Sequence, residues 1–126
     1  MKRTEADLHR AICIYIQLQY PLVIFNSDLS GQNTTKRQSV VNKDLRSSKG
    51  FPDIIIYESC NNYHALFLEV KKETPYKKDG TLKSNKHLEE QQEMHNRLKD
   101  KGYYARFVWD FEQAKETVDF YLTKKI

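Results

Sequence analysis

The chain has 126 residues, of which 39% are hydrophobic and 12% aromatic, enough to build one small domain with its own core and too much for wholesale disorder. No apolar run approaches the roughly 20 residues that a membrane-spanning helix needs, and the N-terminus lacks a signal-peptide core, so we expect a soluble, cytoplasmic protein without membrane contact. The net charge of +4 favours anionic partners without identifying them.

The first half of the chain predicts a helix, a short strand and a basic loop. Apolar residues at helical spacing predict the helix over residues 5–19, and Pro21 ends it. Residues 22–26 form a short β-rich run. Residues 32–49 are polar and carry five basic side chains against one acid. This composition fits a loop that contacts a phosphate backbone, and it fits an ordinary solvated loop equally well.

The second half predicts a β-hairpin followed by a helix, a strand and a last helix. These elements span residues 53–58, 65–72, 88–99, 103–109 and 111–123. The order along the chain is therefore αβββαβα, which indicates an α/β fold with a mixed sheet flanked by helices. We see no internal repeat and no linker, so residues 1–126 are expected to form a single domain.

The pairing register of the hairpin decides where its charged residues lie. A register that joins like faces gives two wholly apolar cross-strand pairs, Ile54 with Leu68 and Ile56 with Leu66. The same register puts Asp53 directly across from Glu69. It leaves an odd number of residues in the turn, such as 60–62, so we expect a three- or five-residue loop and not a two-residue Asn-Asn turn.

Three charged residues of the hairpin converge on one spot in this register. Asp53 and Glu69 would have Cβ atoms about 5 Å apart, and two like charges at that distance destabilise a hairpin. Lys71 points to the same side and offsets only part of the repulsion. A divalent cation would offset the rest, because Mg²⁺ takes one or two carboxylates and keeps waters or substrate oxygens. A single acid at a strand end is usually only solvated, but this triple, which Pro52 precedes, favours a site.

These residues match a known signature. Pro52-Asp53 and Glu69-Val70-Lys71 resemble the two halves of the PD-(D/E)xK nuclease motif. The wider pattern is similar to the VRR-NUC branch of that superfamily, as the stretches KGFPDIIIY, LFLEVKKE and HLEEQQEMHNRLKDKGYYARFV show. The resemblance extends from Glu5 to about residue 122. It implies a restriction-endonuclease-like core.

The resemblance also implies a reaction, the metal-dependent hydrolysis of phosphodiester bonds in DNA. Asp53 and Glu69, with the backbone carbonyl of Val70, would hold Mg²⁺ or Mn²⁺, and no small-molecule cofactor is implied. Lys71 would position the attacking water and stabilise the charge that develops on the phosphate.

The resemblance also implies roles for two further residues. Gln91 lies on an otherwise mostly apolar helical stripe and would face the catalytic centre, although a core glutamine bonded to the backbone is the ordinary alternative. Glu5 would reach the metal site directly or through water, although an acid in a first helical turn is expected in any case.

The DNA contacts and the preferred DNA structure are less specific. The candidate phosphate-binding residues are Lys36, Arg37, Lys43, Arg46, Lys49, Lys77, Lys78, Lys83 and Lys86. Standalone members of this branch resemble homodimers that cleave Holliday junctions, so branched DNA and a homodimer are expected. A flap- or restriction-type nuclease, a non-catalytic DNA-binding module and a protein-interaction domain remain alternatives.

Overall fold

The computed structural model describes residues 4–28 and 50–123, and the element order within them is the predicted one. The elements are α1 (Glu5–Gln19), β1 (Phe25–Ser27), β2 (Ile54–Ile56), β3 (Leu66–Val70), α4 (Lys86–Asp100), β4 (Tyr104–Val108) and α5 (Phe111–Thr123). The strands are shorter than expected. Helix α4 begins two residues earlier than expected, because the Asn85 side chain accepts hydrogen bonds from the first free backbone N–H groups of the helix.

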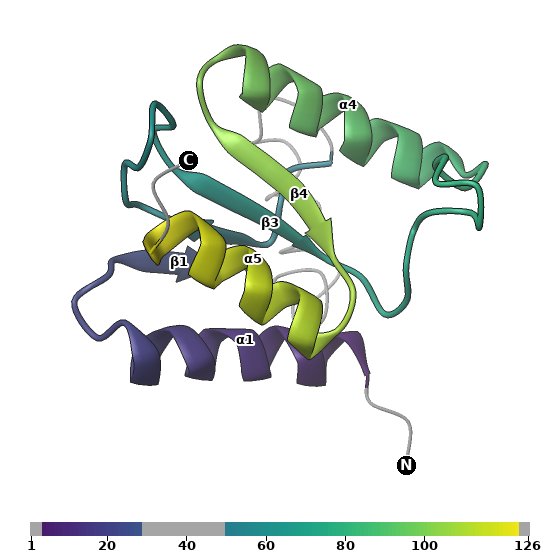
Figure 1. The fold of residues 1–126 in the computed structure, drawn as a ribbon. Helices are drawn as coiled ribbons and strands as arrows, with labels where there is room; N and C mark the ends of the chain where they lie inside the picture. Colours follow the sequence, from purple (N-terminus) through teal and green to yellow (C-terminus); the bar gives the residue numbers. More distant parts are fainter. Residues whose placement is uncertain (1–3, 29–49, 124–126) are drawn as a thin grey trace, which may run out of the picture.

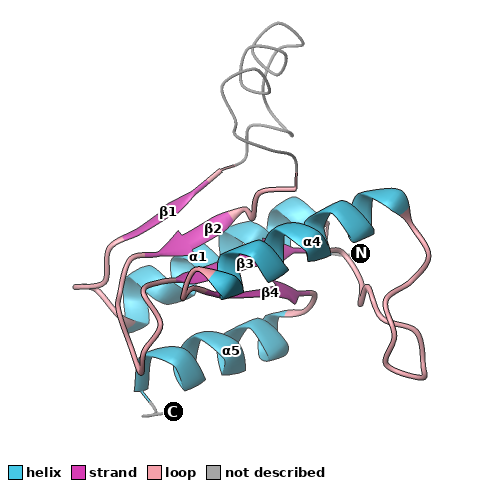
Figure 2. Ribbon diagram, turned by 90° about the horizontal axis from the view of Figure 1, so that it is seen from above, coloured by secondary structure: helices cyan, strands magenta, loops and turns pink. Residues whose placement is uncertain are grey.

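The described strands form one mixed sheet in the order β1-β2-β3-β4 (Figure 2). Strands β1 and β2 are antiparallel, as are β2 and β3, and the crossover through α4 makes β4 parallel to β3. The hairpin has the predicted register, which is Ile54 opposite Leu68 and Ile56 opposite Leu66. Asp53 and Glu69 are therefore neighbours across the two strands.

The turn of the hairpin differs from our expectation. Its tip is the two-residue Asn61-Asn62 turn that we had rejected, bracketed by a bridge between Cys60 and Tyr63. Both asparagines have positive φ, 52° and 75°, as the tight turns that match the twist of a hairpin require. Three residues separate Ile56 from Cys60 but only two separate Tyr63 from Leu66, so one extra residue restores the register beyond the turn.

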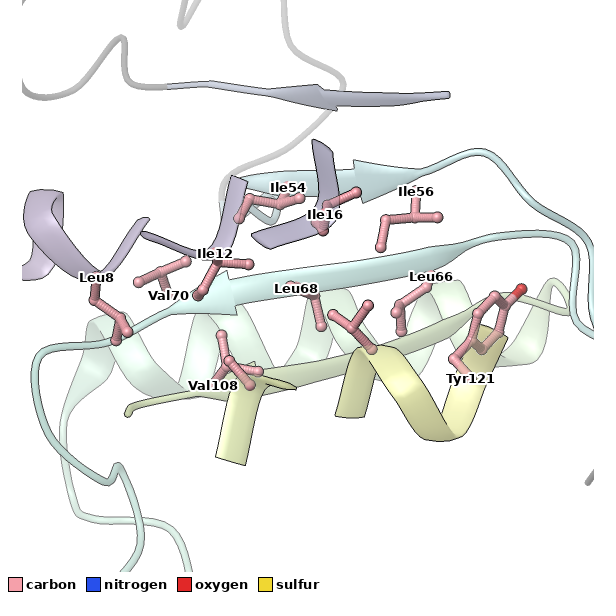
Figure 3. Close-up of a cluster of buried hydrophobic side chains, with 12 residues drawn as sticks. Leu8, Ile12, Ile16, Ile54, Ile56, Leu66, Leu68, Val70, Val108 and Tyr121 are labelled. Carbon is pink, nitrogen blue, oxygen red and sulfur yellow. The ribbon is translucent and has the colours of Figure 1, made fainter. Parts of the chain in front are cut away.

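The helices cover the two faces of the sheet unequally (Figure 1). Helices α1 and α5 lie on the face that carries the even-numbered residues of the hairpin, and Leu8, Ile12 and Ile16 of α1 are fully buried in this main core (Figure 3). Helix α4 lies on the opposite face, where Met94 and Leu98 pack against Phe67. This second face is the one that also carries Asp53, Glu69 and Lys71.

Helix α1 is anchored at both ends. At its start, Thr4 and Asp7 exchange side-chain and backbone hydrogen bonds of 3.0 and 3.1 Å in a capping box. Towards its end, Tyr15 and Tyr20 each donate a hydrogen bond of 2.6 Å to the same carboxylate oxygen of Asp119 on α5. The first turn of α1 is therefore held in a fixed place relative to the sheet.

None of the described helices is both long enough and apolar enough to cross a membrane.

Candidate active site

Asp53 is held by the backbone on both sides of the hairpin. Its N–H donates to the Leu68 carbonyl at 3.0 Å, and its side-chain Oδ2 accepts from the Val70 N–H at 2.9 Å. The segment before it runs tightly along α4, since a Cβ on Gly50 would lie 2.9 Å from the Glu90 carbonyl oxygen. Gly50 also has a φ of +80°, so this position favours glycine on two counts. The chain segment that leads into Asp53 is therefore packed closely against the backbone of α4.

Glu69 is the charged residue that the fold buries most completely, among those it describes. Its side chain is 4% exposed, and its Oε1 atom has no hydrogen-bond partner. Burial raises the pKa of Glu69 well above its usual value, and the neighbouring Asp53 carboxyl raises it further through charge and a side-chain hydrogen bond, while Lys71 acts in the opposite direction. The fold by itself therefore disfavours the charged form of the Glu69 carboxyl.

Lys71 and Glu5 meet at the end of β3. Lys71 continues the strand, with its N–H donating to the Val108 carbonyl at 2.8 Å. Burial raises the pKa of the Glu5 carboxyl, whereas the Lys71 charge and the Lys72 N–H lower it. The charge of Asp53 also raises the pKa of the Glu5 carboxyl. The first turn of α1 therefore faces the same spot as the hairpin acids, although α1 packs on the other face of the sheet.

Gln91 lies on the inward face of α4. The side chain is 4% exposed, its Nε2 lies 3.3 Å from Nε2 of His87, and its Oε1 has no partner. A core glutamine bonded to the backbone, our ordinary alternative, is not what the structure shows. A buried amide oxygen left unpaired on the side of the sheet that carries Glu69 indicates a place for a further polar group.

The arrangement matches a known structure. Over 99% of this chain and 93% of the other, it superposes on a solved protein described as a "VRR_NUC domain protein", with a TM-score of 0.69 and 17% sequence identity. The chain has the VRR-NUC fold. The resemblance drawn from the motifs is confirmed at the level of the fold, which is α/β with a four-stranded mixed sheet flanked by three helices in the described residues.

Comparisons by sequence alone found no relative. No family model matches the chain, and no curated protein matches it. The chain therefore shares its fold with the solved VRR_NUC protein but few of its residues.

The carboxylates of this VRR-NUC fold fit a hard divalent cation. No three His, Cys, Asp or Glu side chains gather into a metal-binding group in residues 4–28 and 50–123. Two adjacent carboxylates remain, Asp53 and Glu69, and Val70, whose backbone carbonyl completes the predicted set, directly follows Glu69. Such a set suits Mg²⁺, which takes one or two carboxylates and keeps several waters, better than zinc, which needs more protein ligands. The unpartnered Oε1 of Glu69 is the atom left free for it.

A cleft lies beside this spot, at the start of α4. It has a volume of about 390 Å³, and Glu5, Lys71 and Lys72 line one side of it. Lys83 and His87 line it from the loop before α4 and from α4 itself. The cleft thus joins the N-terminal end of the 15-residue helix α4 to Lys71 and Glu5, and it carries Lys71, Lys72 and Lys83 together with the acids Glu5 and Glu73.

The structure separates the basic residues that we predicted to contact DNA. Lys83 lines the cleft, whereas Lys77 and Lys78 are exposed in a turn away from it and Lys86 is exposed at the start of α4. The remaining candidates lie outside the described residues, namely Lys36, Arg37, Lys43, Arg46 and Lys49. Lys72, which lines the cleft, was not among our candidates.

Two buried histidines near the acids were given no role by the sequence reading, although His95 shares the predicted helical stripe of Gln91. His9 is 2% exposed and His95 is 1% exposed, and each has an Nε2 atom without a partner. Burial lowers the pKa of His95 to about 4, with smaller contributions from Lys99 and Lys71. Burial also lowers the pKa of His9, and the Asp53 and Asp28 charges oppose this. The available signal was spacing, because each histidine lies four residues after a candidate, Glu5 or Gln91.

Proposed function

We propose that this chain is a metal-dependent DNA endonuclease, with residues 1–126 as one nuclease domain. One observation carries the proposal: the buried Glu69 with a free oxygen, beside the half-buried Asp53 and with Lys71 next to it, in a VRR-NUC fold. A protein that needed only stability would not bury an acid beside a second carboxyl, because a buried charge must be compensated. The pair is best explained by a cation that it holds during function.

Asp53 and Glu69 would hold one Mg²⁺ or Mn²⁺ together with the carbonyl oxygen of Val70. When bound, the cation polarises the scissile phosphate and lowers the pKa of a bound water. The backbone prepares this site, since the Val70 N–H fixes Oδ2 of Asp53 and orients the carboxylate. Binding of the cation would favour the ionised form of Glu69, against the direction in which burial shifts its pKa.

Lys71, Glu5 and Gln91 act around the two carboxylates. Lys71 carries a compact positive charge at the end of β3 and would stabilise the charge that develops on the phosphate. Glu5, fixed by the anchored α1, would orient water on the far side of the site. Gln91 would offer its unpartnered Oε1 to a water or use its amide N–H groups toward a phosphate.

The DNA structure that is cut is the less specific part of the proposal. The motif resemblance supports branched DNA, in particular the Holliday junction, cut by a homodimer in the cytoplasm. Phe107 of β4 and Tyr121 of α5 are buried and not available to an interface, whereas Phe120 of α5 is exposed. The exposed apolar side chains Leu22 and Ile24 support an interface beside α1 and β1.

The test is a cleavage assay in Mn²⁺ on linear duplex, flap and four-way junction DNA of matched sequence. We expect the four-way junction to be cut fastest. Lys71→Ala should lower the rate by roughly 100-fold or more, as removal of a charge-stabilising group does in other enzymes. Lys101→Ala removes an exposed lysine at the far end of α4 and should cleave like the wild type.

The alternatives predict other results in the same assay. A flap- or restriction-type nuclease would prefer the flap or the duplex, and the junction preference would then be wrong. A non-catalytic DNA-binding module would bind DNA without cutting it, and Asp53→Asn would behave like the wild type in Mn²⁺. That second result would overturn the nuclease proposal itself.

A further inference from the structure

His9 is buried, polar and unused by the reaction proposed above. Its ring is 2% exposed, and its Nε2 atom is enclosed without a hydrogen-bond partner. A buried ring nitrogen left unpaired destabilises the fold, so proteins rarely keep one without a use. An apolar residue of similar size would remove that cost. Core packing alone therefore does not explain why a histidine occupies this position.

The position of His9 follows from its neighbours on α1. Glu5, His9 and Cys13 are spaced four residues apart and so lie on one face of the helix. At one end of this face, Glu5 reaches the Lys72 N–H beyond β3, and at the other end Cys13 hydrogen-bonds Ser27 of β1. His9 lies between them. It therefore faces the strand ends that Asp28 and Asp53 occupy.

Asp28 and Asp53 are themselves joined, since the Asp28 N–H donates to the Asp53 carbonyl at 2.8 Å. Both carboxylates lie close enough to His9 to act on its charge. The unpartnered Nε2 of His9 is enclosed on the side of α1 that these carboxylates approach, where a carboxylate oxygen or a water would satisfy it.

We infer that His9 is a positioning residue for the metal site: when a divalent cation occupies Asp53 and Glu69, Nε2 of His9 hydrogen-bonds the Asp53 carboxylate or a water between them. The inference rests on the proposed function. A direct ligand role does not fit, because His9 does not join Asp53 and Glu69 in a group of three among the described residues. Groups that hold a ligand in place from behind typically change metal affinity by about 10- to 100-fold.

The test measures Mn²⁺ affinity of the full chain by isothermal titration calorimetry, together with melting temperature in EDTA. His9→Leu should weaken Mn²⁺ binding by roughly 10-fold or more. In EDTA it should melt at the same temperature as the wild type or higher, because it removes an unpaired buried nitrogen. His64→Leu makes the same change at an exposed histidine and should leave both measurements unchanged.

A second pair of variants keeps the test decisive if His9→Leu does not fold. The amide of His9→Gln reaches the place of Nε2, whereas that of His9→Asn reaches only the place of Nδ1. Gln should therefore bind Mn²⁺ nearly as the wild type does, and Asn should bind it roughly 10-fold more weakly. Equal Mn²⁺ affinity in the wild type and all folded variants would overturn the inference.

Failure of the inference and failure of the proposed function give different results. If the wild type binds Mn²⁺ and cuts DNA while the His9 variants bind Mn²⁺ as tightly, only the role of His9 is wrong. If the wild type neither binds Mn²⁺ nor cuts DNA, the metal-dependent nuclease is wrong, and the role of His9 fails with it.

Discussion

Glu69 is an acidic residue that the fold buries beside a second carboxyl, that of Asp53. It is the first member of Glu69-Val70-Lys71, and alternation along β3 turns it toward the α4 side of the sheet. There it is nearly enclosed and meets a second carboxyl, so its pKa is raised. A glutamine of the same shape would have no such penalty. Burial beside a second carboxyl therefore disfavours the charged form of this acid, and the Lys71 charge acts in the opposite direction.

The raised pKa predicts how the metal-free protein responds to pH. The folded state keeps the Glu69 proton to a higher pH than the unfolded state, whose carboxyl titrates near 4.5. Its favourable contribution is therefore complete below that value and is lost as pH rises through the folded pKa. In EDTA, the free energy of unfolding of the wild type should fall as the pH rises above about 4.5, and more steeply than that of Glu69→Gln. Equal slopes in urea denaturation would contradict this prediction.

Strand pairing sets the geometry at the scale of elements. The hairpin register brings Asp53 opposite Glu69, and the turn must be compatible with it. The structure satisfies both demands with a tight Asn61-Asn62 turn and one extra residue before it. An irregularity of this kind shifts the alternation by one residue, as a bulge does. The acids meet because the irregularity lies between the turn and the paired strands.

The positive φ of Asn62 makes the turn testable. Asn62→Gly should leave the free energy of unfolding unchanged or raise it slightly, since glycine adopts this conformation freely. Asn62→Val should lower it by about 1–2 kcal/mol, the cost of placing a β-branched side chain in the left-handed region. Ser59→Val, a matched control just before the turn, should cost less. Denaturant titration measures all three, and an Asn62→Val variant as stable as the wild type would refute the observed turn.

At the scale of the whole molecule, the site lies where three elements end. The hairpin contributes Asp53, Glu69 and Lys71, the start of α1 contributes Glu5, and α4 contributes Gln91. The capping box and the bonds to Asp119 hold α1, and the close passage of Gly50 holds the hairpin against α4. Because separate elements bring these residues together only in the folded chain, a cation bound there should stabilise the entire fold.

We therefore expect Mn²⁺ to raise the melting temperature. At 100 times its dissociation constant, a ligand that binds only the folded state adds about 2.7 kcal/mol, which corresponds to roughly 10 °C for a chain of this size. EDTA should reverse the shift. Asp53→Asn should abolish it, because one of the two carboxylates is lost. Thermal melts followed by circular dichroism check this, and an equal shift in the variant would show that Mn²⁺ binds elsewhere.

Local patterns of the sequence determined much of this protein. The order of the elements, the hairpin register and the convergence of Asp53 and Glu69 follow from periodicity and alternation, which depend on residues close together in the chain. The restriction-endonuclease-like fold followed from the motifs, and the solved VRR_NUC structure confirms it. The roles assigned to the site residues stay predictions.

Tertiary structure alone decided the rest. The Asn-Asn turn depended on an extra residue that no pairing rule located, and the burial of His9 and His95 depended on helices packing from opposite faces of the sheet. A histidine on a helix is equally suited to solvent or to a core, and only its neighbours settle which it meets. The sequence likewise predicted both Lys77 and Lys83 as DNA contacts, because it does not show which loop residues lie near the site. Of these two, the fold places only Lys83 in the cleft that Lys71 and Glu5 line.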